Sequence, residues 1–296
     1  MEKVNVLIST YNGEKYITAQ IDSILNQTYT NLRIYVRDDG STDQTVSILK
    51  TYEKRNQIVL LEGENVGFGR SFMQLLQYAE DGDYWAFCDQ DDIWDSHKLD
   101  KAVKQLKSMP DTEPNLYFHN FFLTDENMNI TGTYRNCIPD YSFQMAITEC
   151  LHMGFATVFN SRFRELMLKG DITQIPSHDW WAELIAMEFG NVYTDDYIGA
   201  RHRRLDVSVS GNGLGSRIKW FFGALKGSSE IPELAKEFLH VFGNEMKLKD
   251  KEVLEWFVME RCSIKKILKK FFYGRRWRTS LTSELVLRFL MLAGKI

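Results

Sequence analysis

Three acids stand close together in the stretch WAFCDQDDIW (Trp85–Trp94) of this 296-residue sequence. Asp89, Asp91 and Asp92 fall within four positions directly after an apolar run, so their carboxylates repel one another. One aspartate would suit a solvated turn that caps the next helix. Three of them suggest instead a hard divalent cation, Mn²⁺ or Mg²⁺, which one or two carboxylates hold while substrate phosphates supply the remaining ligands.

A second acidic pair, Asp38 and Asp39, precedes Gly40 and Ser41. A turn between a strand and a helix accounts for the last two residues, because Gly40 tolerates a special backbone conformation and Ser41 with Gln44 fits a capping box. The two acids are more than such a turn requires. A carboxylate here is a candidate acceptor for the N–H of a nucleotide base or for a ribose hydroxyl.

Alternating strands and helices must position these groups. The apolar patterns predict strands at residues 4–10, 32–40, 58–63 and 84–88, and helices at 14–27, 41–52, 68–79 and 96–109. Such alternation predicts an α/β fold with parallel strands and right-handed crossovers. Ligands bind beyond the carboxyl ends of such strands, so Thr10, Tyr11 and Asn12 should share one rim with both acidic clusters.

The pattern loosens after about residue 115. We predict further strands at 115–124 and 154–160, a helix at 180–190, a mixed polar loop at the end of 191–202, and helices from Ser216 onward. With 44% hydrophobic and 26% charged residues, the composition is that of a globular protein with a packed core. The four cysteines lack CxxC or metal-ligand spacing, which indicates reduced thiols in a cytoplasmic protein.

The ends of the chain give two further expectations. Residues 1–10 lack the shape of a signal peptide, and no run of about 18 apolar residues predicts a membrane-spanning helix. Residues 261–278 hold eight basic residues and no acid, with Phe, Tyr and Trp between them. The segment is either a helical cap with a solvated basic face or an in-plane amphipathic helix on an anionic membrane, and the interleaved aromatic residues favour the membrane. The acidic remainder of the chain argues against a nucleic-acid partner.

Several motifs together resemble family 2 of the inverting glycosyltransferases. They are VNVLISTYNG, RDDGSTDQT, ENVGFGRSF and CDQDDIW, in this order, while DQDDIW and HDWW are most similar to the bacterial rhamnosyltransferase branch. The resemblance covers about residues 1–210. It implies a nucleotide-diphospho-sugar binding (GT-A type) fold, with a mostly parallel sheet flanked by helices. The catalytic domain would span residues 1–215, with a nucleotide-sugar half (1–112) and an acceptor half (113–215), before a helical, basic region over 216–296.

The resemblance also implies roles at the donor. Thr10, Tyr11 and Asn12 would line the base and ribose, and Asp39 would pair with the pyrimidine. Asp89 and Asp91 would form an Asp-x-Asp motif with Asp92 beside it, and which of them touches the ribose and which the metal stays open. The remaining donor residues would be Asn65, Gly67 and Arg70, with Arg70 at the diphosphate.

The HDWW motif is the candidate acceptor site. Asp179 would be the general base that takes the proton of the acceptor hydroxyl, although an aspartate at a helix start also suits a structural cap. Trp180 and Trp181 would stack on sugar faces, or one of them would belong to the core. Family members often carry Arg-x-His before a following Ser-Gly, and counting back from Ser210 favours Arg203 over His202 as a donor ligand.

We therefore expect a metal-dependent inverting glycosyltransferase on the inner face of the bacterial cell membrane. By resemblance, it would move L-rhamnose from dTDP-L-rhamnose onto a glycan or lipid-linked glycan of the cell wall or capsule. A UDP-hexose donor on the same fold is one alternative. A nucleotidyltransferase would want a loop rich in glycine and lysine after the first strand, where only Gly13 and Lys15 occur. A non-catalytic scaffold of a polysaccharide assembly complex is the last alternative.

Overall fold

The computed structural model describes residues 1–135, 141–204, 229–258 and 263–296. Nine strands form one sheet in the order β3-β2-β1-β4-β8-β6-β9-β5, with β7 beside β6. The strands are β1 (Val4–Thr10), β2 (Leu32–Asp38), β3 (Val59–Glu62), β4 (Tyr84–Cys88), β5 (Ile93–Trp94), β6 (Asn115–Thr124), β7 (Ile130–Tyr134), β8 (Thr157–Asn160) and β9 (Asn191–Arg203).

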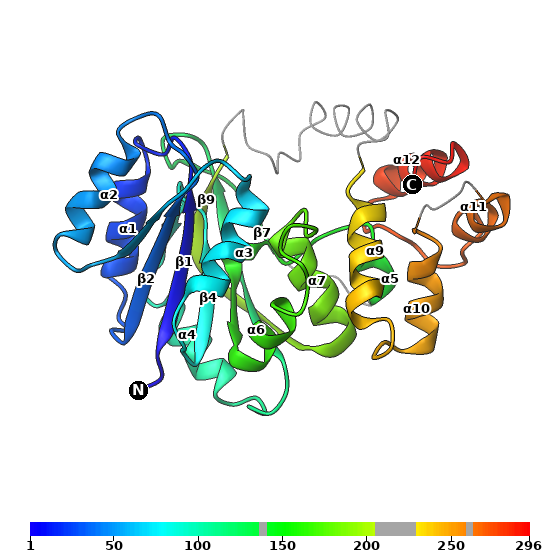
Figure 1. Cartoon of the computed structure of the whole chain (residues 1–296), viewed down its shortest axis with the longest axis horizontal. Coiled ribbons are helices and arrows are strands. Elements are labelled where there is room, and N and C mark those ends of the chain that lie inside the picture. The colour runs from blue at the N-terminus through cyan, green and yellow to red at the C-terminus, as the bar shows by residue number, and fades with distance from the viewer. Residues whose placement is uncertain (136–140, 205–228, 259–262) are drawn as a thin grey trace.

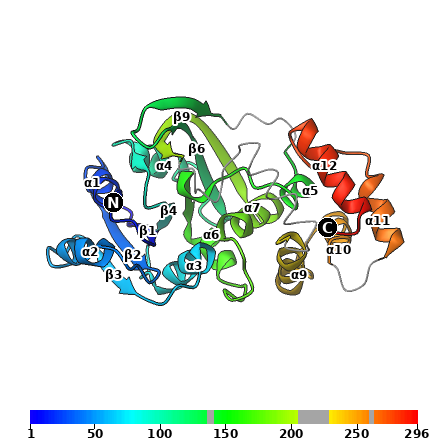
Figure 2. The same ribbon diagram turned by 90° about the horizontal axis from the view of Figure 1, so that it is seen from above.

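Helices cover both faces of this sheet. The helices of the described residues are α1 (Ile17–Leu25), α2 (Thr45–Glu53), α3 (Phe68–Tyr78), α4 (Lys98–Leu106), α5 (Phe143–Ala146), α6 (Ser161–Met167), α7 (His178–Phe189), α9 (Ile231–Phe242), α10 (Leu248–Glu255), α11 (Ile264–Phe271) and α12 (Leu281–Leu292). Seen from above, α1 and α4 lie on one side of the sheet and α3 and α6 on the other (Figure 2).

The four strands predicted to be parallel are parallel. β2 pairs with β1 and β3, and β4 pairs with β1, all in parallel register. Strand β1 thus ends level with strand β2, because Thr10 lies opposite Asp38. The carboxyl ends of β1, β2 and β4 therefore form the rim at which ligands of such sheets bind (Figure 1).

The second half of the sheet is mixed. β8 is antiparallel to both β4 and β6, and β9 runs parallel to β6 with register shifts on either side of Asn120. The predicted polar loop at the end of 191–202 is wrong, because β9 continues to Arg203 and pairs there with the short β5. This pairing sets Ile93 opposite Arg201 and brings the end of β9 against the acidic loop.

The predicted capping box is also wrong. Helix α2 begins at Thr45 with Gln44 as its N-cap residue, and neither Ser41 nor Gln44 caps it through a side chain. The Ser41 hydroxyl donates instead to the Asp38 carboxylate, a stronger acceptor than a backbone carbonyl. Asp38 also accepts the backbone N–H of Gly40 and of Ser41, so its role here is to fix the turn.

The C-terminal helices pack beside α5 and α7 at the far end of the molecule (Figure 1). Trp181 of α7 is fully buried and contacts Phe238 and Phe242 of α9. The predicted helical character is confirmed for the described residues, while the predicted domain boundary at 215/216 lies outside them. In the described ranges, no helix is long and apolar enough to span a bilayer.

Gly69 sets how closely α3 approaches the segment before α7. A Cβ at Gly69 would lie 2.5 Å from the carbonyl oxygen of Pro176, and that carbonyl belongs to the backbone, which cannot swing aside. We expect Gly69→Ala to lower the free energy of unfolding by about 1–3 kcal/mol, more than alanine returns as a helix former.

Urea unfolding measures this change. Gly274→Ala is the matched control, since a Cβ there meets nothing within 4 Å and should change stability by less than about 0.5 kcal/mol. Equal stability of the two variants would show that α3 and the Pro176 segment are not in this contact.

Candidate active site

The loop between β4 and β5 carries the three acids, and the end of β9 supplies their partner. Asp92 is fully buried, and its Oδ1 accepts hydrogen bonds from His202 Nδ1 at 2.9 Å and from the backbone N–H of Arg203 at 3.2 Å. One ligand atom each from Asp89, Asp92 and His202 lie within 4.8 Å of one another. Two hard oxygen donors and one imidazole nitrogen suit Mn²⁺ or Mg²⁺.

His202 is held in place by aromatic rings as well as by Asp92. Its ring stacks on Phe155 at a centroid distance of 4.4 Å and meets the edge of Phe121 at 5.7 Å. Burial alone would lower the pKa of His202, but the Asp92 carboxylate and its hydrogen bond outweigh burial and raise the pKa to about 9. With no ion present, the imidazole is therefore the cation that balances Asp92 at neutral pH.

The acids are still short of positive charge. Burial, followed by repulsion from Asp92, raises the pKa of Asp91 to about 6, and burial with repulsion from Asp92 and Asp91 raises the pKa of Asp89 well above its usual range. Asp92 Oδ2 is buried and has no hydrogen-bond partner among the residues that the structure describes. An orphaned, buried carboxylate oxygen beside two further acids fits a bound cation, since a buried charge is costly unless it is paired.

A buried lysine lies behind the acids. Lys98 Nζ donates to the carbonyl of Phe155 at 2.6 Å and sits 3.3 Å from the centre of the Trp94 ring. Burial lowers its pKa to about 7, and the charges of Asp92 and Asp89 oppose that shift. Nothing in the sequence patterns singled out Lys98, because one lysine at the start of a helix looks like an ordinary surface residue.

The predicted nucleotide loop is bound to the acidic loop through Gln90. Gln90 Oε1 accepts the Thr10 hydroxyl at 2.6 Å and the Tyr11 backbone N–H at 2.9 Å, and Gln90 Nε2 donates to the Tyr11 carbonyl. The Tyr11 ring is left exposed. Asn12 has φ +48°, a left-handed conformation that asparagine tolerates, and its Oδ1 accepts the backbone N–H of Thr42.

Asp39 is buried and already engaged. Its carboxylate forms an ion pair with Arg37 and accepts the backbone N–H groups of Val66 and Gly67, each at 2.9 Å. These contacts fix the loop that carries Asn65 and Gly67 beside the rim. One oxygen, Oδ2, accepts a single hydrogen bond and retains the capacity for another. Pairing of Asp39 with a pyrimidine therefore stays a prediction.

The three remaining donor candidates lie at the start of α3. Gly67 has φ +86° and open space where a Cβ would be, which is the geometry of a backbone that a ligand approaches closely. Asn65 and Arg70 are exposed on either side of it. The structure thus brings them to the same edge as the acids, and their donor contacts stay predictions.

Asp179 lies in the first turn of α7, but Ser177 is the N-cap residue and accepts the Trp180 backbone N–H. The purely structural reading of Asp179 as the cap is therefore wrong. Asp179 Oδ1 accepts from the Ser177 hydroxyl and from the Trp180 N–H. A Cβ at Gly154 would lie 3.4 Å from the Cβ of Asp179, and the next residue, Phe155, stacks on the ring of His202. The structure therefore brings the predicted base and the predicted metal site together.

The two tryptophans of HDWW differ in burial and in the partners they contact. Trp181 is fully buried, with its Nε1 donating to the Met167 carbonyl, so the predicted stacking on a sugar is wrong for this residue. It faces the core because α7 must pack on α9 as well as on the sheet. Trp180 is half-buried and donates to the Ala146 carbonyl at 2.7 Å, so sugar stacking on its ring stays a prediction.

Arg203 and His202 exchange the places predicted for them. Arg203 Nε donates to the Asp91 carbonyl at 2.9 Å, and its guanidinium lies 4.4 Å from the centre of the Tyr16 ring. Arg203 thus braces the backbone of the acidic loop, while His202 faces the acids. Counting back from Ser210 missed this arrangement; the strand pairing of Ile93 with Arg201 is the signal that reveals it.

Comparison with known proteins places this site in a wider group. The family model described as "Glycosyl transferase family 2" matches residues 5–164. The UDP-Glc:alpha-D-GlcNAc-diphosphoundecaprenol beta-1,3-glucosyltransferase WfaP of Escherichia coli is 28% identical over 162 residues, 55% of this chain and 62% of that protein. The dTDP-rhamnosyl transferase RfbG of Shigella flexneri is 36% identical over 105 residues, 33% of this chain and 36% of that protein.

A third relative is the putative teichuronic acid biosynthesis glycosyltransferase TuaG of Bacillus subtilis, 40% identical over 109 residues, 36% of this chain and 41% of that protein. The chain spans between 19% and 62% of the lengths of such curated relatives.

Solved structures confirm the predicted GT-A type fold. Staphylococcus aureus TarS 1-349 matches with a TM-score of 0.59 and 16% identity, over 99% of this chain and 80% of that one. The mannosyltransferase PcManGT of Pyrobaculum calidifontis, in complex with GDP-Man and Mn²⁺, matches with a TM-score of 0.52 and 16% identity, over 99% and 86%.

The His202–Asp92 pair predicts a pH dependence of stability. The pKa of His202 rises from 6.5 in the unfolded chain to about 9 on folding. The stabilisation is therefore complete below about pH 6.5 and is lost as the pH rises through 9. We expect His202→Gln to cost about 2–3 kcal/mol at pH 6 and much less at pH 10.

Urea unfolding in EDTA at both pH values measures the difference between variant and wild type. Taking the difference removes the opposite effect of Lys98, whose lowered pKa adds stability as the pH rises. His240→Gln, at an exposed position on α9, is the control. A loss at pH 10 as large as that at pH 6 would contradict the ion pair.

Proposed function

The chain belongs to glycosyl transferase family 2, and on that premise we propose that it is a metal-dependent inverting glycosyltransferase. It would transfer a sugar from a nucleotide-diphospho-sugar to a hydroxyl group of a glycan or lipid-linked glycan. The observation that supports this most is the group formed by Asp89, Asp92 and His202 at the carboxyl ends of the strands. Asp179 lies against Gly154, whose neighbour Phe155 stacks on His202.

The donor would bind along the rim of the sheet. The exposed ring of Tyr11 offers a surface for the base, with the buried Thr10 behind it, and the open approach at Gly67 admits the nucleotide close to the main chain. Asp89, Asp92 and His202 would hold the cation, with Asp91 beside them. A divalent cation bound there would neutralise the diphosphate and stabilise it as the leaving group.

Asp179 would act on the acceptor. Its Oδ1 is fixed by Ser177 and by the Trp180 N–H, which orients the carboxylate. The acceptor hydroxyl loses its proton to Asp179 as its oxygen attacks the anomeric carbon from the face opposite the diphosphate. The bond to the diphosphate breaks in the same displacement, so the configuration inverts and no covalent sugar–enzyme intermediate is needed.

We propose dTDP-L-rhamnose as the donor, with a UDP-hexose as the competing candidate. The dTDP-rhamnosyl transferase RfbG supports the first and the UDP-Glc enzyme WfaP supports the second. The two bases differ by one methyl group on the pyrimidine ring, and the exposed ring of Tyr11 can stack on either. A direct comparison of donors must therefore decide between them.

The product would be a polysaccharide of the cell wall or capsule. Two relatives support this class: WfaP is a glucosyltransferase for a diphosphoundecaprenol-linked sugar, and TuaG is a putative glycosyltransferase of teichuronic acid biosynthesis. We propose that the enzyme works at the inner face of the cell membrane, attached peripherally through the basic segment 261–278, of which residues 261 and 262 lie outside the described part.

A thermal-shift screen of sugar nucleotides tests donor and metal together. With Mn²⁺, dTDP-L-rhamnose at 100 times its Kd should stabilise the fold by about 2.7 kcal/mol, and chelation should remove the effect. A metal ligand must be deprotonated, and the pKa of His202 is about 9 with no ion present, so protons should compete with Mn²⁺ and weaken its binding as the pH falls below 9. The weakening should steepen below pH 6, because burial raises the pKa of the neighbouring Asp91 to about 6.

The control is Asp81→Asn, an exposed acid away from the rim, set beside Asp89→Asn. A larger shift with UDP-glucose would assign the competing donor. No shift with any sugar nucleotide, with or without metal, would contradict the proposed function.

The role of Asp179 has its own test. Asp179→Asn keeps the shape of the side chain but cannot accept the acceptor proton, so turnover should fall by about 10²–10⁴-fold while donor binding stays. Glu165→Gln, an exposed residue of α6 paired with Arg162, is the matched control and should keep full turnover. Unchanged turnover in Asp179→Asn would remove this residue from the mechanism, and inactivity of the wild type towards every acceptor would favour the scaffold alternative.

A further inference from the structure

The last two helices leave large apolar side chains in solvent. On α11 and just after it these are Ile264, Leu268 and Phe272, and on α12 they include Leu281, Leu285 and Leu292. Their exposed fractions run from 44% for Leu268 to 73% for Ile264 and Phe272. Spacings of four and seven residues place each set along one face of its helix. Proteins that act alone in water seldom expose apolar faces of this extent.

The charges that these two helices themselves carry are almost all positive, although Lys269 pairs with Glu252 of α10 at 3.1 Å. Residues 263–296 contain nine basic residues and one acid, Glu284. Glu284 is buried and forms an ion pair with Arg288 at 2.6 Å, so it offers no negative charge to a partner. Among the basic residues, Lys265, Lys269, Arg275 and Arg276 are exposed.

This combination selects the kind of partner. An apolar row beside exposed cations matches the interface of a bilayer with anionic headgroups, where the row enters the acyl boundary and the cations meet the lipid phosphates. A second copy of this chain would bring the same positive charge to the contact. Charge complementarity therefore favours the membrane over self-association.

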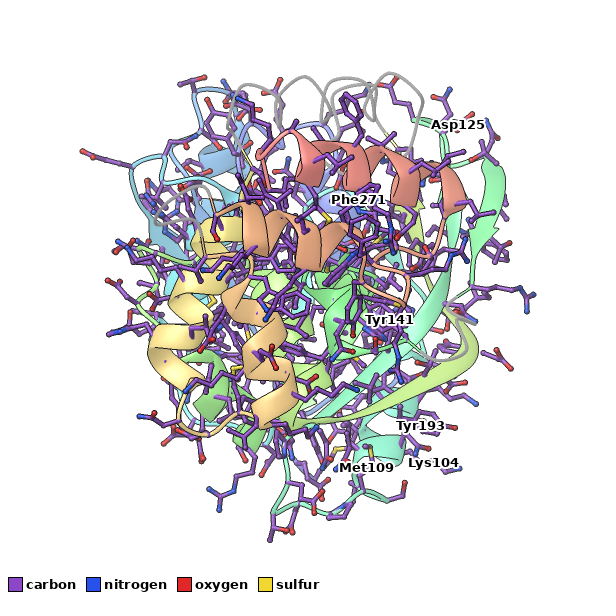
Figure 3. All side chains as sticks on the ribbon, turned by 90° about the vertical axis from the view of Figure 1, so that its right-hand side faces the viewer. Lys104, Met109, Asp125, Tyr141, Tyr193 and Phe271 are labelled. Carbon is purple, nitrogen blue, oxygen red and sulfur yellow. The ribbon has the colours of Figure 1, made fainter. Side chains whose placement is uncertain are left out.

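The two helices form one unit that is tied to the rest of the molecule. Helices α11 and α12 pack against each other at the C-terminal end, and Figure 3 labels Phe271 of α11 where the two helices meet. Arg288 of α12 donates to the carbonyls of Tyr273 at 3.1 Å and Arg275 at 2.9 Å. Arg288 thus fixes the turn between the helices to α12.

Two further bonds join this unit to the catalytic part. The Thr148 hydroxyl donates to the Trp277 carbonyl at 2.7 Å, and the Thr279 N–H donates to Glu149 at 2.8 Å. Ala146, two residues before Thr148, accepts a hydrogen bond from Trp180 Nε1 at 2.7 Å, and Trp180 directly follows Asp179 in α7. The helix pair is therefore anchored next to the candidate acceptor site.

We propose that α11 and α12 together are a bilayer-docking surface, in which the apolar row of α12 enters the interface of an anionic membrane. This adds α12, which lies outside the segment 261–278, as the apolar part of the attachment. In Figure 1, α12 and the carboxyl ends of the parallel strands lie toward the same upper edge, so docking would turn the rim toward the membrane. The surface stands on its own residues, and its use in meeting a lipid-linked acceptor rests on the proposed function.

Co-sedimentation with vesicles tests the surface. The full chain should bind vesicles of phosphatidylcholine with about 30 mol% phosphatidylglycerol at least about tenfold more tightly than pure phosphatidylcholine, because the basic residues meet anionic headgroups. The variant Leu281→Ser/Leu285→Ser/Leu292→Ser should lose at least about tenfold of that binding. The control is Leu248→Ser, since Leu248 is 86% exposed on α10 and should be dispensable.

Two measurements keep the outcome clear. Hydrolysis of the sugar nucleotide in the presence of Mn²⁺ should be the same in the triple variant as in the wild type, which separates a failure of docking from a failure of the proposed function. If the triple variant does not fold, Arg275→Glu/Arg276→Glu should lose vesicle binding in its place.

Three results would overturn the proposal. One is wild-type protein that does not sediment with anionic vesicles. Another is a correctly folded triple variant that binds them as tightly as the wild type. The third is a dimer, seen by light scattering, that the triple variant abolishes without any binding to vesicles, which would assign the row to contact between copies.

Discussion

The structure around the rim depends on one electrostatic constraint: a fully buried carboxylate, Asp92, lies close to two partly buried ones. Asp92 has no exposed surface, and burial raises the pKa values of Asp89 and Asp91. A buried charge without a counter-charge is among the costliest features a fold can contain. The end of β9 offsets this cost by placing His202 against Asp92. The pairing of β9 with β5 holds His202 at that position.

The sequence was most informative where one element follows another in a regular order. The first four strands and the ligand rim could be predicted because alternating apolar patterns imply parallel strands, and the carboxyl ends of parallel strands share an edge. The acids after β4 stood out because no fold gains stability from their repulsion. These two arguments need no knowledge of contacts between distant residues.

Long-range pairing is what the patterns did not contain. Counting from a later Ser-Gly favoured Arg203 over His202, and only the pairing of β9 with β5 shows that His202 is the residue that faces the acids. Trp181 and Trp180 look alike in sequence, and only the packing of α9 decides that the first is core. Ser41 does not cap α2 as expected, because its hydroxyl donates to the carboxylate of Asp38, three residues earlier, which is a better acceptor.

Gln90 has a thermodynamic consequence. Its amide belongs to the loop of the acids, yet it carries the backbone of Tyr11 and the hydroxyl of Thr10 on the neighbouring strand. A ligand that binds the acidic loop would therefore also change how well the loop after β1 is ordered. Linkage is reciprocal, so whatever free energy an ion contributes to the affinity for a nucleoside, the nucleoside returns to the affinity for the ion. If an ion and a nucleotide bind as proposed, this single amide couples their two binding steps.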